Sequence, residues 1–76
     1  MQYLEDIISK VLEIDPAVIK DSTRPADIES WDSFNGLMLV AELEKQYNLR
    51  FSIEEVISVK NVGDIRKILR QHGIDV

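Results

Sequence analysis

The sequence contains no cysteine, so it forms no disulfide and offers no thiolate ligand to a metal ion. It has one histidine, His72, which lies near the end of the sequence with no second His or Cys to join it at a metal site. We therefore expect His72 to be solvated rather than catalytic, and we predict no metal site.

Long apolar segments are also missing. No stretch approaches the roughly 20 apolar residues that a membrane-spanning helix needs. Glu5 and Asp6 interrupt the first apolar residues, which argues against a signal peptide. We expect a cytoplasmic protein with no membrane span.

Basic residues are scarce, with 9 Lys or Arg against 14 Asp or Glu and a net charge of −5. Residues 1–59 hold five basic and twelve acidic residues, a net charge of −7, whereas residues 60–76 carry +2. A nucleic-acid partner needs a basic face, so this charge disfavours a small helix-turn-helix DNA binder. An acidic surface keeps a small protein in solution and also suits docking onto basic partners.

At 76 residues, 45% of them hydrophobic, the sequence predicts one domain over residues 1–76 with a single small core. No disulfide or metal reinforces that core, so we expect its stability to be marginal. We expect the protein to be a monomer.

The N-terminal third predicts one helix followed by a long connection. Residues 3–14 carry an amphipathic stripe of Leu4, Ile7, Ile8, Val11 and Leu12. Asp15-Pro16 ends that helix, and residues 15–32 form the connection, with a short helical turn at Pro16–Ile19. Three apolar residues are available to pin the connection to the core: Val18, Ile19 and Ile28.

Residues 33–47 predict a second helix with two apolar faces. The core face holds Gly36, Leu39, Val40, Leu43 and Tyr47. The second face holds Phe34, Leu37, Met38 and Ala41. Either loop residues such as Ile28 cover this second face, or it is a docking patch for a partner.

The C-terminal part predicts a short helix and a last, longer one. Asn48 ends the second helix, and Ser52 and Glu55 form a capping box that opens a short helix through about Ser58. Asn61 caps the last helix, and Gly73 follows its end. The last helix has an apolar stripe of Val62, Ile65, Ile68 and Leu69.

The predicted fold is all-α: a small four-helix bundle with three longer helices, one short helix and a long first loop. No strand is predicted, because residues 49–53 alternate apolar and polar side chains over too short a span. The predicted core consists of Leu4, Ile7, Ile8, Val11, Leu39, Leu43, Tyr47, Phe51, Ile65 and Ile68.

Asp32-Ser33 marks the start of the second helix. Asp is a preferred N-cap, so Asp32 should accept a hydrogen bond from the Asn35 backbone N–H. The Ser33 hydroxyl should then lie near solvent, where the positive end of the helix favours a phosphate ester. A serine at a helix start usually serves only as a cap, so this position alone does not establish a covalent role.

The whole pattern resembles the acyl carrier proteins. Asp32-Ser33-Phe34 stands where that family usually has Asp-Ser-Leu, and residues 39–44 continue as its apolar and acidic second helix. Phe51, Glu54-Glu55 and the run Asn61-Val62-Gly63-Asp64-Ile65 follow the family's spacing. The resemblance covers essentially the whole sequence.

The resemblance implies a carrier rather than an enzyme. Ser33 would bear a covalent 4′-phosphopantetheine, with Asp32 beside it in the cofactor site. A carrier-protein synthase, the phosphopantetheinyl transferase, would supply that group from coenzyme A. The thiol would then hold acyl or aminoacyl groups as thioesters for acyl-transferring or condensing enzymes.

The partner-binding surface is predicted on the N-terminal half of the second helix. Asp32 would contribute charge there, an apolar set would contribute contact, and Glu42 and Glu44 would border it with negative charge. The predicted surface comprises Phe34, Asn35, Leu37, Met38, Ala41, Glu42 and Glu44.

Four further residues depart from the family pattern. Asn35, Met38 and Lys45 stand where the resemblance implies acidic or polar residues, and Trp31 replaces a small one. These departures favour a specialised pathway (polyketide, nonribosomal peptide, or cell-surface lipid or polysaccharide) over fatty-acid synthesis. The alternative is a small acidic helical interaction domain in which Ser33 is only a cap and is never pantetheinylated.

Overall fold

The computed structural model describes residues 3–76, which form four α-helices and two short 3-10 turns. The helices are α1 (Leu4–Leu12), α2 (Ser33–Tyr47), α3 (Ile53–Ser58) and α4 (Val62–Gln71). The turns η1 (Pro16–Val18) and η2 (Pro25–Asp27) lie in the first connection. No strand occurs within the described residues, so the predicted all-α architecture is confirmed.

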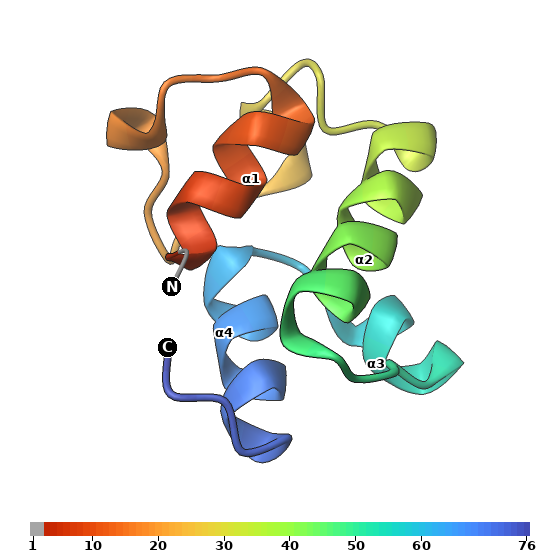
Figure 1. Ribbon diagram of the computed structural model, residues 1–76. Helices are drawn as coiled ribbons and strands as arrows, with labels where there is room; N and C mark the ends of the chain where they lie inside the picture. The colour runs from red at the N-terminus through yellow and green to blue at the C-terminus, as the bar shows by residue number, and fades with distance from the viewer. Residues whose placement is uncertain (1–2) are drawn as a thin grey trace.

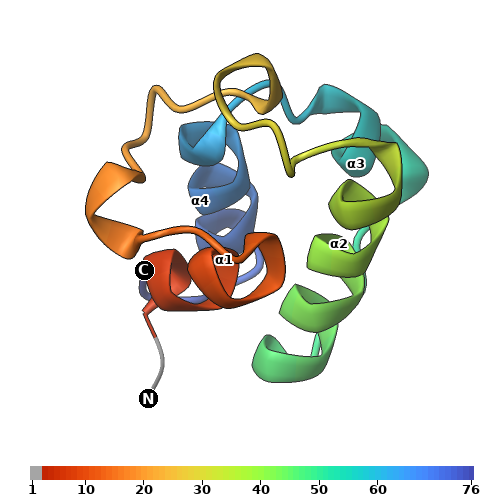
Figure 2. The same cartoon turned by 90° about the horizontal axis from the view of Figure 1, so that it is seen from above.

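Figures 1 and 2 show α1, α2 and α4 around a common centre, with α3 beside α2 in both views. Helix α1 packs against α2. The first connection runs from the end of α1, past the start of α4, to the start of α2. This path brings the segment just before Ser33 next to the bundle.

The helix ends follow local sequence signals. The capping box of Ser52 and Glu55 opens α3, and Asn61 caps α4 through its side chain, as predicted. Asn48 ends α2 in the left-handed region, with φ 53°, and Gly73 follows α4 with φ 88°. Helix α1 is shorter than the predicted span 3–14, because Glu13 already adopts a left-handed conformation, with φ 56°.

The core gathers side chains from three helices and from the first connection. Of the ten residues predicted to form it, Val11, Tyr47 and Phe51 are only half-buried and pack around the others. Trp31 and Thr23 are also buried, although no local pattern predicted it. The buried residues are Leu4, Ile7, Ile8, Leu12, Ile19, Thr23, Trp31, Leu39, Leu43, Val62, Ile65, Ile68 and Leu69.

The prediction that three apolar residues hold the first connection against the core is confirmed in part. Ile19 is buried and Ile28 is half-buried against the core. The prediction is wrong for Val18, which is 52% exposed, because η1 turns its side chain outward. The predicted turn at Pro16 is confirmed as η1, whereas η2 was not predicted.

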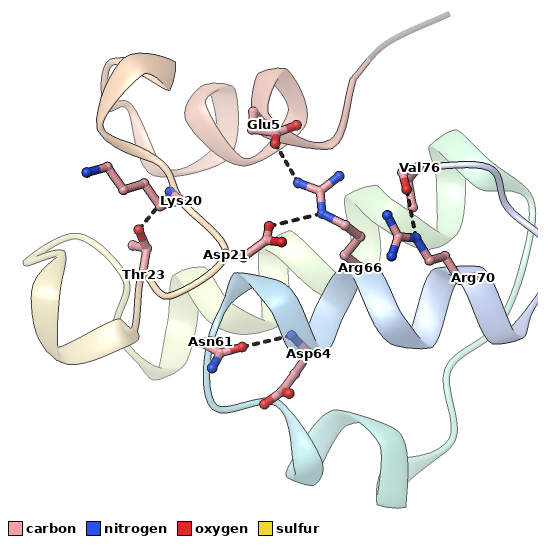
Figure 3. Close-up of polar contacts among 9 residues, drawn as sticks. All are labelled: Glu5, Lys20, Asp21, Thr23, Asn61, Asp64, Arg66, Arg70 and Val76. Atoms are coloured by element: carbon pink, nitrogen blue, oxygen red, sulfur yellow. Dashed lines mark hydrogen bonds and ion pairs between the residues drawn. The ribbon is translucent and has the colours of Figure 1, made fainter.

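Polar contacts fasten the first connection to α4 (Figure 3). The backbone N–H groups of Val62 and Gly63 donate to the carbonyls of Thr23 (2.9 Å) and Asp21 (2.8 Å). Arg66 forms ion pairs with Asp21 (3.0 Å) and with Glu5 of α1. A Cβ at Gly63 would lie 3.1 Å from the Asp21 carbonyl, so this close approach favours glycine. The connection is therefore tied to two helices.

We expect Leu43→Ala to lower the free energy of unfolding by about 2–5 kcal/mol, because Leu43 is 1% exposed and the truncation leaves a cavity. Leu37→Ala is the matched control, since Leu37 lies on the same helix at 65% exposure. Its expected cost is about 0.5 kcal/mol or less. Urea denaturation followed by circular dichroism measures both. Equal losses for the two variants would contradict the assignment of the core face.

Candidate functional site

Ser33 is the first residue of α2, and its side chain is exposed. Asp32 precedes it as N-cap, and its Oδ1 accepts a hydrogen bond from the Asn35 backbone N–H at 2.9 Å, as predicted. The Gly36 N–H donates to the Asp32 carbonyl at 2.8 Å. The start of α2 is thus well defined, with its serine hydroxyl presented to solvent.

The segment before Ser33 is held from both sides. The Ser30 hydroxyl donates to the Leu12 carbonyl at the end of α1, at 2.7 Å. The Asn35 side-chain amide donates back to the Ser30 carbonyl at 2.8 Å. These bonds fix the position of Trp31 and Asp32 relative to both α1 and α2. They also give half-buried Asn35, a predicted partner residue, a structural role.

The second apolar face of α2 is open. Phe34 is 69% exposed, Leu37 65% and Met38 49%, and Ala41 is exposed as well. Ile28 packs against the core, so the interpretation that the loop covers this face is wrong. Ile53 and Ile57 on α3 are also largely exposed. The patch of Phe34, Leu37, Met38 and Ala41 is therefore available for contact next to Ser33.

Two predicted border carboxylates already have hydrogen-bond donors. Glu44 accepts the Phe51 backbone N–H at 2.8 Å, which holds the chain between α2 and α3. Glu42 accepts from the Gln46 side chain at 2.9 Å and lines a small cavity against Ile7 of α1. Both side chains are half-buried. Both carboxylates therefore accept hydrogen bonds within the fold, which the sequence did not indicate.

A cavity of about 190 Å³ lies beside Ser33, which the sequence did not predict. It is open to solvent on one side and lined by residues of α2, α4, the α3 region and the first connection. Exposed Ser33, Leu37 and Pro25 stand at its opening, and buried Trp31 stands inside. The lining residues are Pro25, Trp31, Ser33, Gly36, Leu37, Leu39, Val40, Leu43, Val56, Val59 and Ile65. Nearly all of them are apolar, so the cavity suits a hydrocarbon group.

Helix α3 supplies one wall of this cavity and is anchored by polar contacts. Ser52 and Glu55 exchange the two capping-box bonds, at 2.8 Å and 3.1 Å. The other oxygen of Glu55 lies 2.9 Å from Nε2 of His72, whose ring meets Phe51 edge to face. His72 is exposed, as predicted, and it also contacts Glu55 and Phe51, which the sequence did not indicate. The Ser52 N–H, and after it the bond to His72, lower the pKa of Glu55 against the opposing effect of desolvation.

Within residues 3–76, no group of three or more His, Cys, Asp or Glu side chains is placed to hold a metal ion. No helix in this part of the chain is long and apolar enough to cross a membrane.

Comparisons with known proteins agree on one family. The family model described as "Phosphopantetheine attachment site" matches residues 2–69. An acyl carrier protein from Brachyspira hyodysenteriae is 31% identical over 70 residues, which are 91% of this chain and 90% of that protein. One from Clostridium acetobutylicum is 30% identical over 71 residues, covering 93% and 92% of the two chains.

Solved structures give the same picture. The solution structure of a holo acyl carrier protein from Geobacter metallireducens has a TM-score of 0.77 and 31% identity, covering 96% of this chain and 90% of that one. A candidate acyl carrier protein from Mycobacterium tuberculosis has a TM-score of 0.80, with coverage of 92% and 99%. At 23% identity, the second likeness concerns the fold alone.

The chain belongs to the phosphopantetheine-attachment family, that of the acyl carrier proteins. Its prosthetic group is accordingly 4′-phosphopantetheine, and the protein is a carrier, not an enzyme. Membership also implies that it meets a phosphopantetheinyl transferase and enzymes that handle acyl groups.

We expect the capped state of α3 to weaken in acid. Because the pKa of Glu55 is lowered from its ordinary 4.5, its stabilising contribution is present above that value and is lost as the pH falls through the lower folded-state pKa. Backbone chemical shifts of α3 should therefore move toward coil values below about pH 4.5. Glu55→Gln should flatten this transition, whereas Glu54→Gln, at the exposed neighbouring position, should keep it. An unchanged transition in Glu55→Gln would exclude this carboxylate as the cause.

Proposed function

We propose that Ser33 is the residue that bears the 4′-phosphopantetheine. The observation that carries the proposal is an exposed serine hydroxyl at the capped start of α2, directly beside an apolar cavity. The first turn of α2 presents backbone N–H groups and the positive end of the helix dipole, both of which favour a phosphodiester there. Asp32 fixes the helix start and places a negative charge beside the attachment point.

The attachment reaction requires an accessible hydroxyl on this chain. The Ser33 oxygen forms a bond to the phosphorus of coenzyme A that carries the pantetheine, as the phosphoanhydride bond breaks. Adenosine 3′,5′-bisphosphate leaves, and the serine proton passes to a base of the transferase. The pantetheine thiol supplies the thioester chemistry, while Ser33 and its surroundings only hold and present it.

We further propose that the single domain of residues 1–76 carries acyl or aminoacyl groups in a specialised pathway, of the polyketide, nonribosomal peptide or cell-surface type. The apolar cavity beside Ser33 supports an apolar cargo. The exposed Phe34, Leu37 and Met38 support partners that recognise an apolar patch more than an acidic one. A carrier that works on coenzyme A derivatives belongs where coenzyme A is used, which we take to be the cytoplasm.

Ser33→Ala should abolish modification without unfolding the protein, since an exposed helix-start side chain makes little contact. Incubation with coenzyme A and a broad-specificity phosphopantetheinyl transferase should add one phosphopantetheinyl mass to the wild type and none to the variant. Ser22→Ala, at an exposed serine of the first connection, is the matched control and should be modified normally. An unmodified wild type would favour the alternative, a helical interaction domain in which Ser33 is only a cap.

We also propose that partners dock on the patch of Phe34, Leu37, Met38 and Ala41. Met38→Glu should weaken binding to the cognate enzyme, because it places a charge in an apolar contact that governs dissociation. Wild-type binding should depend less on salt than that of a strongly acidic carrier. Affinity and transfer rate across a salt series measure both effects.

Val18→Glu is the matched control for this substitution. Val18 is 52% exposed, close to the 49% of Met38, and lies in η1 on the far side of α1 from α2 (Figures 1 and 2). It receives the same charge away from the patch, so its binding should stay near that of the wild type. Circular dichroism verifies folding. Wild-type affinity in Met38→Glu would place the docking surface elsewhere.

A further inference from the structure

Trp31 is the only tryptophan of the sequence and lies two residues before Ser33. Its side chain is 7% exposed and belongs to the same buried cluster as Leu39 and Ile65. The three residues also line the cavity beside Ser33. One indole ring is therefore both a part of the core and a wall of the cavity. Because packed core residues surround it, the ring has little room to retreat from a cargo.

Gly36 lies against this ring and lines the same cavity. A Cβ at Gly36 would lie 3.7 Å from Nε1 and 3.9 Å from Cδ1 of Trp31. Both are ordinary van der Waals distances, so an alanine methyl fits here without displacing the indole. The glycine therefore leaves space open between the ring and α2. The bulk of Trp31 and the missing side chain of Gly36 together set the room available to a cargo.

The indole also carries an available donor. Within residues 3–76, the Trp31 Nε1–H donates to no protein acceptor, and no sealed-off side-chain nitrogen or oxygen lacks a partner. The Nε1–H is therefore accessible to solvent. Because Nε1 lies 3.7 Å from the Cβ position of Gly36, which lines the cavity, the donor lies at the cavity. A cargo that fills the cavity displaces solvent from this donor, so a cargo that brings an acceptor is favoured over one that leaves the donor unpaired.

We propose that Trp31 and Gly36 select the cargo of this carrier. They admit short acyl chains, of about seven carbons or fewer by comparison with a cavity of ~150 Å³ that holds benzene, and they favour chains with a hydrogen-bond acceptor for the indole. Longer chains extend beyond the 190 Å³ cavity into solvent. The proposal rests on attachment at Ser33.

Thioester protection tests this selection. A transferase that accepts acyl-coenzyme A loads butanoyl, hexanoyl, decanoyl, 5-oxohexanoyl or the isosteric 5-methylhexanoyl group onto the full chain, and mass spectrometry verifies loading at Ser33. The readout is the half-life of each thioester in hydroxylamine, divided by that of the same thioester on free pantetheine. Each methylene enclosed should lengthen this ratio by about fourfold. In the wild type this increase in the half-life ratio should end at a chain shorter than decanoyl.

Three variants separate bulk from hydrogen bonding. The chain length at which protection stops increasing should become shorter in Gly36→Ala and longer in Trp31→Leu. Trp31→Phe keeps an aromatic wall, so its length limit should stay near that of the wild type. Without the donor, the advantage of 5-oxohexanoyl over 5-methylhexanoyl should fall by about fivefold, as expected for one neutral hydrogen bond. Val18→Ala, away from the cavity, is the control and should match the wild type.

The outcomes are distinct. A limit that shifts in opposite directions in Gly36→Ala and Trp31→Leu supports the proposal. If Trp31→Leu does not fold by circular dichroism, the shift in Gly36→Ala and the lost acceptor preference in Trp31→Phe decide it. Identical profiles in the wild type, Gly36→Ala and Trp31→Phe overturn it while leaving the carrier function intact. Failure to load Ser33 at all overturns the proposed function instead.

Discussion

Two backbone hydrogen bonds, from Val62 and Gly63 to the carbonyls of Thr23 and Asp21, hold the long first connection on α4, and the site depends on them. A connection of this length loses much conformational entropy when it is ordered, so it needs such anchors. Once it is anchored, the chain that follows brings Pro25 and Trp31 to the cavity and Asp32 to the start of α2. One side of the cavity is thus formed by a connection whose position is set by its anchor on another helix.

The local features of the fold were predictable from the sequence. Asp32, Ser52 and Asn61 cap their helices as expected, because a cap depends on a few neighbouring residues. Apolar periodicity likewise identified most of the core. It missed Trp31 and Thr23, whose burial depends on segments distant in the sequence. The same limit applies to α1, whose early end comes from a left-handed Glu13 that no strong turn residue marks.

The features of the candidate site fall into the same two groups: those set by neighbouring residues and those set by segments distant in the sequence. The capped and exposed start of α2 followed from Asp32-Ser33, and the family resemblance agrees with relatives about 31% identical to this chain. The cavity did not follow, because it is formed by four segments that meet only in three dimensions. Nor did the contacts that engage Glu44 and His72, which link residues 7 and 17 positions apart. Glu44, predicted to border the partner surface, also holds the chain between α2 and α3, and His72, predicted to be solvated, also contacts Glu55 of α3.

The ion pairs of Arg66 bear on the order in which the protein is made. Arg66 contacts Asp21, 45 residues earlier, and Glu5, 61 residues earlier. Contacts this distant form late, because the intervening chain must be closed into a loop first. On the ribosome, Ser33 emerges well before residues 62–66, which anchor the connection on which the cavity depends. A nascent chain therefore exposes its serine before its cavity is complete, and the complete carrier arises only after residues 62–66 have emerged.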